Sequence, residues 1–175
     1  MIHEDTVKLL RECDAGVKMG VSSIGEVLDN VHNGEFRRCL RTCLEEHEKL
    51  QQEIQQLLDR FSDQGKDPNP IAKGMSWMKT NMKMGMEPSD ETAADLITDG
   101  CNMGVKSLNR YLNQYRAADE VSKDIAKRTV VIKVLNHYEF SIKATILMNC
   151  KKLSAFVSYV YNILKILAAK SNRLL

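Results

Sequence analysis

Apolar residues recur every three or four positions over the first sixty residues, which is the spacing of amphipathic helices packed in a bundle. The sequence HNGE at residues 32–35 interrupts this pattern with Asn33 and Gly34, two residues typical of helix ends. The pattern therefore predicts an antiparallel hairpin with helices at residues 5–31 and 35–61. The predicted core positions are Val7, Leu10, Val17, Val21, Ile24, Leu28, Val31, Phe36, Leu40, Cys43, His47, Leu50, Ile54, Leu57 and Phe61.

The pattern changes at residues 66–88, which are rich in methionine and bounded by prolines. Because proline interrupts helices, this stretch is predicted to be a long connection that carries one short helix. Ser89 is a typical N-cap, and the two acidic residues that follow it favour the start of a helix. A third helix is expected to reach about residue 115, and a fourth to begin near residue 118 or 119.

Two segments of the chain repeat each other. AGVKMGVSSIGEVL at residues 15–28 and DGCNMGVKSLNRYL at residues 99–112 match at seven of thirteen positions with a constant offset, which suggests a duplicated hairpin. The copies share a Gly-x-x-x-Gly pair, whose glycines cost roughly 1 kcal/mol each relative to alanine but let two helices approach closely. We expect the first and third helices to cross there; the alternative is that the glycines border a solvent groove. The expected crossing residues are Gly16, Gly20, Gly100 and Gly104.

A duplicated hairpin with a long crossover resembles the ferritin-like four-helix bundle. The segments ECDAGVKMG, EEHEKL, GMSW and DGCNMGVKSLNRYLNQY are similar to a group of bacterial ferritin-like domains of unknown function, over roughly residues 5–128. The resemblance implies an all-α, up-down four-helix bundle with duplicated helical hairpins at residues 1–148. A C-terminal helical extension would follow at residues 149–175. Because the group has no established activity, the resemblance bears on the fold more than on the function.

Residues 129–175 differ in charge from the rest of the chain. They contain one acidic residue, Glu139, and seven basic ones, whereas residues 1–128 are net acidic. Three interpretations fit this tail. It continues the fourth helix and adds a fifth at residues 151–170; or it is an amphipathic appendage that contacts a membrane, although its apolar stretch is too short to span one. In the third, the reading frame has slipped near Arg128, which leaves a tail never selected to complete this fold.

Composition narrows the functional class only slightly. The chain of 175 residues has a formal net charge of +2, too small to suggest nucleic-acid binding, and it has no glycine-rich phosphate loop. The start, MIHEDTVKLL, has acidic residues where a secretory signal would need basic ones, which predicts a cytoplasmic protein. Its five cysteines are then expected to be thiols.

Metal binding is the first candidate chemistry. Ferritin-like bundles with two iron atoms use inward carboxylates and Glu-x-x-His motifs on two helices. Leu44 stands three residues before His47, so this motif is broken and we do not expect a dinuclear centre. Two irregular sites remain as hypotheses, against the simpler interpretation that Asp14 and His47 hydrogen-bond within the core. One places a metal such as iron at Asp14, Glu46, His47, Glu53 and Asp99; the other places zinc or copper(I) at Cys39, Cys43, His47 and Cys101.

The methionine-rich connection is the second candidate, because flexible, polarizable methionine side chains suit an adaptable contact surface. The simpler interpretation is that they fill a groove over the core. No hydrolytic triad, nucleophile elbow or Cys-x-x-Cys pair stands out in the sequence. We therefore expect a non-catalytic protein that acts by association, as a homo-oligomer, with a metal-binding or iron-handling protein as the alternative. The candidate contact residues are Met75, Trp77, Met78 and Met82, accompanied by Met84 and Met86.

Overall fold

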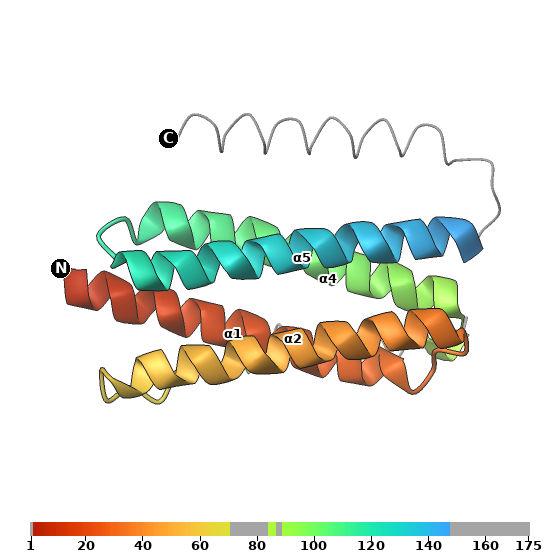
Figure 1. Ribbon diagram of the computed structural model, residues 1–175, viewed down its shortest axis with the longest axis horizontal. Helices are drawn as coiled ribbons and strands as arrows, with labels where there is room; N and C mark the ends of the chain where they lie inside the picture. The colour runs from red at the N-terminus through yellow and green to blue at the C-terminus, as the bar shows by residue number, and fades with distance from the viewer. Residues whose placement is uncertain (1, 71–83, 87–88, 148–175) are drawn as a thin grey trace.

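The computed structural model describes residues 2–70, 84–86 and 89–147, and all regular secondary structure in these ranges is helical. The long helices lie along one common axis (Figure 1). The predicted all-α class is therefore confirmed for the described part of the chain. The helices are α1 (Ile2–Leu28), α2 (Gly34–Asp59), α4 (Asp90–Gln114) and α5 (Glu120–Leu147).

Capping side chains fix where two of these helices begin. The side chain of Asn33 accepts a hydrogen bond from the backbone N–H of Phe36 at 2.9 Å, at the start of α2. The hydroxyl of Ser89 accepts one from the N–H of Thr92 at 3.1 Å, which confirms the predicted N-cap of α4. Helix α1 ends at Leu28, earlier than predicted, because the chain must leave the helical conformation before Asn33 takes the extended one of an N-cap.

Hydrogen bonds between the helix ends give the direction of each helix. The Asp90 carboxylate accepts from the backbone N–H groups of His32 and Asn33, at 2.6 and 2.8 Å, so α4 begins beside the turn between α1 and α2. The N–H of Asp119 donates to the hydroxyl of Thr6 at 2.9 Å, so α5 begins beside the start of α1. Helix α4 therefore runs opposite to α1, and α5 runs parallel to it. Helix α1 packs against the other three, and α2 also contacts α5.

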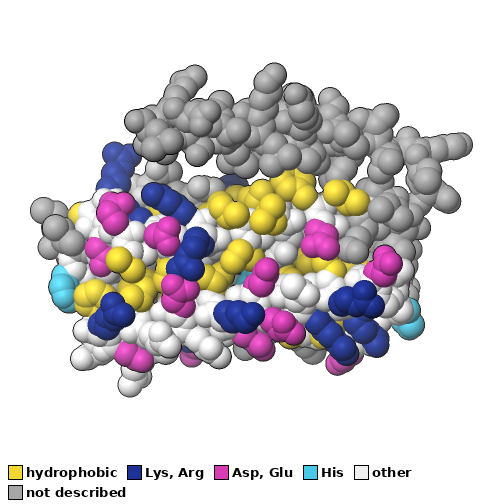
Figure 2. All heavy atoms as spheres, viewed as in Figure 1, with side chains coloured by type: hydrophobic (Ala, Val, Ile, Leu, Met, Phe, Trp, Pro, Cys, Tyr) yellow, Lys and Arg dark blue, Asp and Glu magenta, His cyan; other side chains and the backbone are white. Residues whose placement is uncertain are grey.

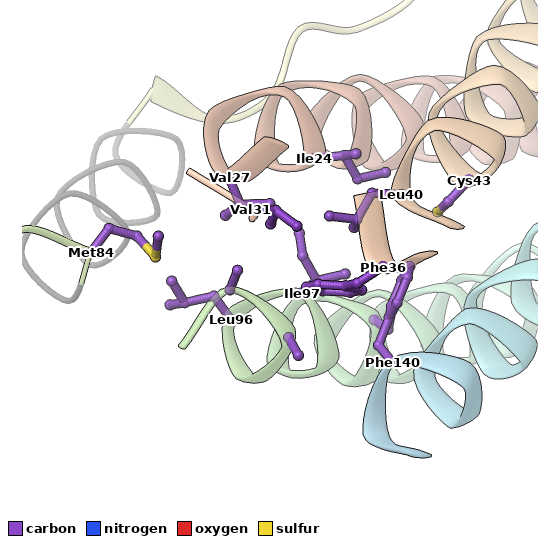
Figure 3. Packing of buried hydrophobic residues seen from close by; sticks show 13 residues of the cluster. Ile24, Val27, Val31, Phe36, Leu40, Cys43, Met84, Leu96, Ile97 and Phe140 are labelled. Atoms are coloured by element: carbon purple, nitrogen blue, oxygen red, sulfur yellow. The ribbon is translucent and has the colours of Figure 1, made fainter. Parts of the chain in front are cut away.

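Apolar side chains form two clusters, one in each half of the bundle. In the half that holds the α1–α2 turn, the rings of Phe36 and Phe140 meet edge to face with their centroids 5.8 Å apart (Figure 3). Each large apolar side chain that is fully buried contributes about 1.5–3 kcal/mol to folding. The first cluster also includes Ile24, Val27, Val31, Leu40, Met84, Leu96 and Ile97, and the second includes Leu9, Leu10, Val17, Leu50, Ile54, Leu58, Leu108 and Ile125.

The predicted core of α2 is confirmed from Phe36 to Ile54, after which Leu58 is buried and Leu57 and Phe61 are only partly covered. The predicted core of α1 is too narrow, because this helix has three neighbours and needs a wider buried face. The residues that are buried there without having been predicted as core are Thr6, Leu9, Cys13 and Val27. The predicted core residues Val7, Val21 and Leu28 are only partly covered.

Several predictions fall on residues outside the described ranges. These include the C-terminal extension at residues 149–175 and the candidate contact residues Met75, Trp77, Met78 and Met82. Of the two remaining methionines of that group, Met84 packs into the first apolar cluster and Met86 is exposed. In the part of the chain that the structure describes, no helix is both long and apolar enough to cross a membrane.

Candidate functional site

A buried histidine and a buried lysine meet at the centre of the bundle, between the two apolar clusters. His47 of α2 is 2% exposed and Lys133 of α5 is 4% exposed, and Lys133 Nζ lies 3.4 Å from His47 Nε2. The Nδ1 atom of His47 lies 2.8 Å from the carbonyl oxygen of Cys43. Because a carbonyl only accepts hydrogen bonds, Nδ1 carries the ring proton, and the lone pair of Nε2 faces the amine.

Three thiols complete this polar centre. The side-chain amide of Asn136 donates to the sulfur of Cys43 at 2.9 Å, which joins α5 to α2 a second time. Cys101 of α4 and Cys13 of α1 act electrostatically on Lys133, so all four helices contribute. Burial raises the pKa of the Cys43 and Cys101 thiols, and that of Cys13 to about 12. The thiols are therefore neutral at physiological pH.

Burial also sets the charge of the two nitrogen bases. Burial first and the nearby Lys133 charge second lower the pKa of His47 to about 4, against the opposing effect of the hydrogen bond to the Cys43 backbone. His47 is thus neutral at pH 7. Burial lowers the pKa of Lys133 as well, because an ammonium group loses its hydration in the interior. A positive charge on Lys133 therefore costs free energy, because the groups around it are uncharged and interact with it only through their dipoles.

Two of the repeated glycines make the room that this centre needs. A Cβ atom on Gly20 would lie 2.6 Å from Cδ2 of His47, and one on Gly104 would lie 2.6 Å from Cδ of Lys133. Both would also lie within 3.5 Å of the Lys133 ammonium nitrogen. The nearest atoms at these glycines belong to side chains from α2 and α5, while Gly16 and Gly100 border open space. Gly20 and Gly104 thus leave space for the side chains of His47 and Lys133. That α1 and α4 cross at these glycines stays a prediction.

The residues of the first predicted metal site do not lie together in the structure. His47 lies in the polar centre, Glu46 lines a surface groove, and Glu53 pairs with Arg128 at the surface. Asp99 is exposed on α4, and Asp14 of α1 binds the backbone of Lys66 and the ammonium of Lys18. Among the described residues, no group of three or more histidine, cysteine and acidic side chains is placed to hold a metal ion.

The second predicted metal set is only partly gathered. The sulfur of Cys43 lies 3.6 Å from Nδ1 of His47, but this nitrogen is engaged by the Cys43 carbonyl. Cys101 is buried on α4, and Cys39 lies on the wall of the groove between α2 and α5. Zinc or copper binding at these residues therefore stays a prediction that would require their side chains to rearrange.

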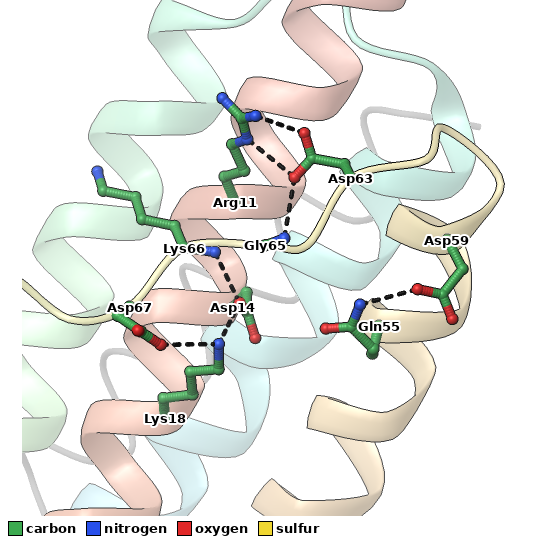
Figure 4. Close-up of polar contacts among 9 residues, drawn as sticks. All are labelled: Arg11, Asp14, Lys18, Gln55, Asp59, Asp63, Gly65, Lys66 and Asp67. Carbon is green, nitrogen blue, oxygen red and sulfur yellow. Dashed lines mark hydrogen bonds and ion pairs between the residues drawn. The ribbon is translucent and has the colours of Figure 1, made fainter.

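Asp14 fastens the segment after α2 to helix α1 (Figure 4). Its side chain is fully buried, and Oδ2 accepts from the backbone N–H of Lys66 and from the ammonium of Lys18, each at 2.9 Å. Gly65 has a φ of +81°, and a Cβ there would lie 2.3 Å from Oδ2 of Asp14, so only glycine fits. A bond from Arg11 to Asp63 strengthens the same attachment. The burial of Asp14 thus has a structural reason, because its carboxylate attaches the segment after α2 to α1.

A groove of about 320 Å³ runs between α2 and α5. Cys43 and Asn136, which belong to the polar centre, are among the residues that line it. Its other lining side chains are mostly polar or acidic, and Glu139 of α5 stands opposite residues of α2. The groove therefore reaches the polar centre at Cys43 and Asn136, whereas His47 and Lys133 do not line it.

The outer face of α5 carries exposed apolar side chains. Val131, Leu135 and Ile142 are 54, 58 and 36% exposed, and their spacing of four and seven residues places them on one face of the helix. Figure 2 shows hydrophobic side chains gathered on the side of the molecule along which α5 runs. We refer to these three residues as the α5 stripe.

Sequence reasoning did not find Lys133, Asn136 or the α5 stripe as functional residues. The signal that could have found the first two is a three-four spacing on α5 that runs through Thr129, Lys133, Asn136 and Phe140. Because three of these four buried positions are polar, hydrophobicity alone does not mark the line.

The chain finds no match among models of protein families, curated proteins or solved structures. Its candidate functional features are therefore those that its own geometry defines: the polar centre inside the bundle and the α5 stripe on its surface.

Proposed function

We propose that this chain is a non-catalytic helical bundle that acts by association, and that it associates through the α5 stripe. The observation that carries the proposal is the exposure of Val131, Leu135 and Ile142 on one helix face. Apolar surface gains about 25 cal/mol for each Å² removed from water, so a partner that covers the stripe is favoured. Contiguous apolar patches on a soluble protein commonly mark sites of interaction.

The fold that we propose for this role is the ferritin-like one, an up-down bundle of two duplicated hairpins. The antiparallel pairs α1–α2 and α4–α5 support it. The segment that follows α2 is bound near the start of α1, whereas α4 begins at the α1–α2 turn, so a long crossover would join the two hairpins. We place the protein in the cytoplasm, which agrees with the buried thiols of Cys13, Cys43 and Cys101.

The residues at the centre support a non-catalytic role more than iron chemistry. A ferritin-type dinuclear centre needs inward glutamates from several helices. Here the inward positions of α2 and α5 at mid-bundle hold His47, Lys133 and Asn136. Lys133 takes one of these inward positions, and the lone pair of Nε2 already faces its nitrogen.

Light scattering on the purified full-length protein tests the proposal. Leu135→Glu places a charge in the middle of the stripe and is expected to convert an oligomer to a monomer. Met103→Glu is the matched control, because Met103 is 70% exposed on α4, and it should leave the oligomer intact. Unchanged assembly of the Leu135→Glu variant would refute the role of the stripe. Stoichiometric iron, zinc or copper in protein prepared without chelators would favour the metal-binding alternative instead.

A further inference from the structure

The groove between α2 and α5 carries unpaired negative charge on both walls. Glu46 of α2 and Glu139 of α5 line it, and neither forms an ion pair with a described residue. Glu35 adds a third carboxylate near the start of α2, and Arg38 supplies the one cation among the described lining residues. Three carboxylates and one guanidinium leave an excess of two negative charges at neutral pH. The groove therefore attracts cations.

A buried amide beside these carboxylates has an unused acceptor. Asn136 lines the groove although it is only 6% exposed. Its side-chain nitrogen donates to the sulfur of Cys43, and no described residue donates a hydrogen bond to its carbonyl oxygen. Protein atoms do not enclose this oxygen, so it is open to the groove. Because buried polar atoms need partners, the donor for this oxygen must come from whatever fills the groove.

The register of α2 and α5 sets the distance between the two carboxylates. Asn136 lies level with Cys43, to which it donates. Because the two helices are antiparallel, Glu139 stands three residues beyond that level in one direction and Glu46 three residues beyond it in the other. At 1.5 Å for each residue the two positions are roughly 9 Å apart along the bundle. The open carbonyl of Asn136 lies about midway between them.

The size of the groove favours an organic cation over a metal ion. Its volume of about 320 Å³ lies within the range of small-molecule pockets, about 300–1,000 Å³. Among the described residues, no three histidine, cysteine or acidic side chains converge as metal ligands would. A primary ammonium group brings a positive charge and three N–H donors, which match both a carboxylate and an amide carbonyl. Two such groups on a short chain can engage both carboxylates at once.

We propose that the groove between α2 and α5 binds a short linear diamine. One ammonium group pairs with Glu46 and the other with Glu139, and an N–H group donates to the carbonyl of Asn136 between them. This inference goes beyond the proposed function, because none of these three residues belongs to the α5 stripe. It also gives the unused acceptor and the excess charge of the groove a common partner.

Isothermal titration calorimetry of the full-length protein with 1,4-diaminobutane at low ionic strength tests the proposal. The wild type is expected to bind one diamine per chain. Glu46→Gln and Glu139→Gln should each raise the Kd roughly tenfold, because each removes one charge-assisted contact and keeps the shape of the side chain. Butylamine, which has a single ammonium group, should bind more weakly than the diamine. A wild type that does not bind the diamine would overturn the proposal.

Matched controls separate a defined site from general attraction to an acidic surface. Glu45→Gln and Glu48→Gln remove exposed carboxylates of α2 that do not line the groove, and they should leave the Kd unchanged. If they weaken binding as much as Glu46→Gln does, the diamine is held by diffuse charge and the inference is wrong. Tighter binding of magnesium or zinc chloride than of the diamine, lost in the same two groove variants, would make the groove a metal site and would also refute it.

Discussion

At the scale of single residues, the two repeated glycine pairs have unequal surroundings. Gly20 and Gly104 stand against His47 and Lys133, whereas Gly16 and Gly100 have nothing within 4 Å. The sequence presents all four as equivalent members of one repeat. The difference depends on side chains from α2 and α5, which approach α1 and α4 only in the folded bundle.

This difference predicts opposite results of the same substitution. Gly16→Ala and Gly100→Ala should stabilise the fold by about 0.5–1 kcal/mol, because alanine favours helix and meets no obstacle. Gly20→Ala should destabilise it, since its methyl group would meet the His47 ring, which the Cys43 carbonyl holds in place. Gly104→Ala should cost less, because the Lys133 side chain is flexible. Urea unfolding of the four variants measures these values, and a stabilised Gly20→Ala protein would contradict the packing described.

The His47 pKa predicts a loss of stability in acid. The pKa of His47 is about 4 in the folded chain, against an ordinary value of 6.5. As the pH falls below 6.5 the unfolded chain binds the proton first, so stability decreases down to about pH 4, by roughly 3 kcal/mol in total. His47→Gln should remove this part of the pH dependence.

Unfolding of the wild type and the variant at a series of pH values between 4 and 7 measures the effect as a difference, in which the titration of carboxylates cancels. His32→Gln is the control, because His32 is exposed at the α1–α2 turn, and it should retain the full wild-type dependence. Parallel curves for wild type and His47→Gln would show that His47 is not buried as described.

At the scale of the helices, α2 could be predicted from its sequence and α5 could not. The apolar spacing of α2 gives its buried face directly, from Phe36 to Ile54. In α5 apolar residues are the buried ones only near the start of the helix, where Ile125 and Ala126 are covered. Further along, Lys133 and Asn136 are buried while Val131 and Leu135 are exposed. Polarity therefore does not give the orientation of α5 between Val131 and Asn136, although Phe140 is again buried.

The same limit applies to the contacts that join distant parts of the chain. Lys133 lies 86 residues from His47, and Lys66 lies 52 residues from Asp14. Sequence reasoning identifies Asp14 and His47 as polar residues on apolar faces that need partners. It cannot name those partners, because they come from another helix and from a loop whose path the local pattern does not specify.

The reversal of polarity within α5 begins close to Arg128, where one interpretation of the tail places a slipped reading frame. Association through the α5 stripe requires that Val131, Leu135 and Ile142 are the residues the gene is selected to encode. We therefore predict an intact frame across codon 128 in DNA sequenced from independent isolates. A frame that differs there between isolates would instead explain both the buried Lys133 and the exposed stripe, and would contradict the proposed function.

At the scale of the whole molecule, the described part of the chain combines a packed interior with an exposed apolar face on α5. Two apolar clusters, with a polar centre between them, hold the four described helices together. The Asp14 attachment binds the segment after α2 to α1 (Figure 4). The outer face of α5 is where large apolar side chains at helical spacing meet water (Figure 2). Association is the simplest use of that face.

Sedimentation velocity of the wild-type, full-length protein over a wide range of concentrations tests this account most directly. The account predicts a transition from a species of 19.9 kDa to a larger one as the concentration rises, because association removes the apolar α5 stripe from water. A single species of 19.9 kDa at every concentration would contradict it.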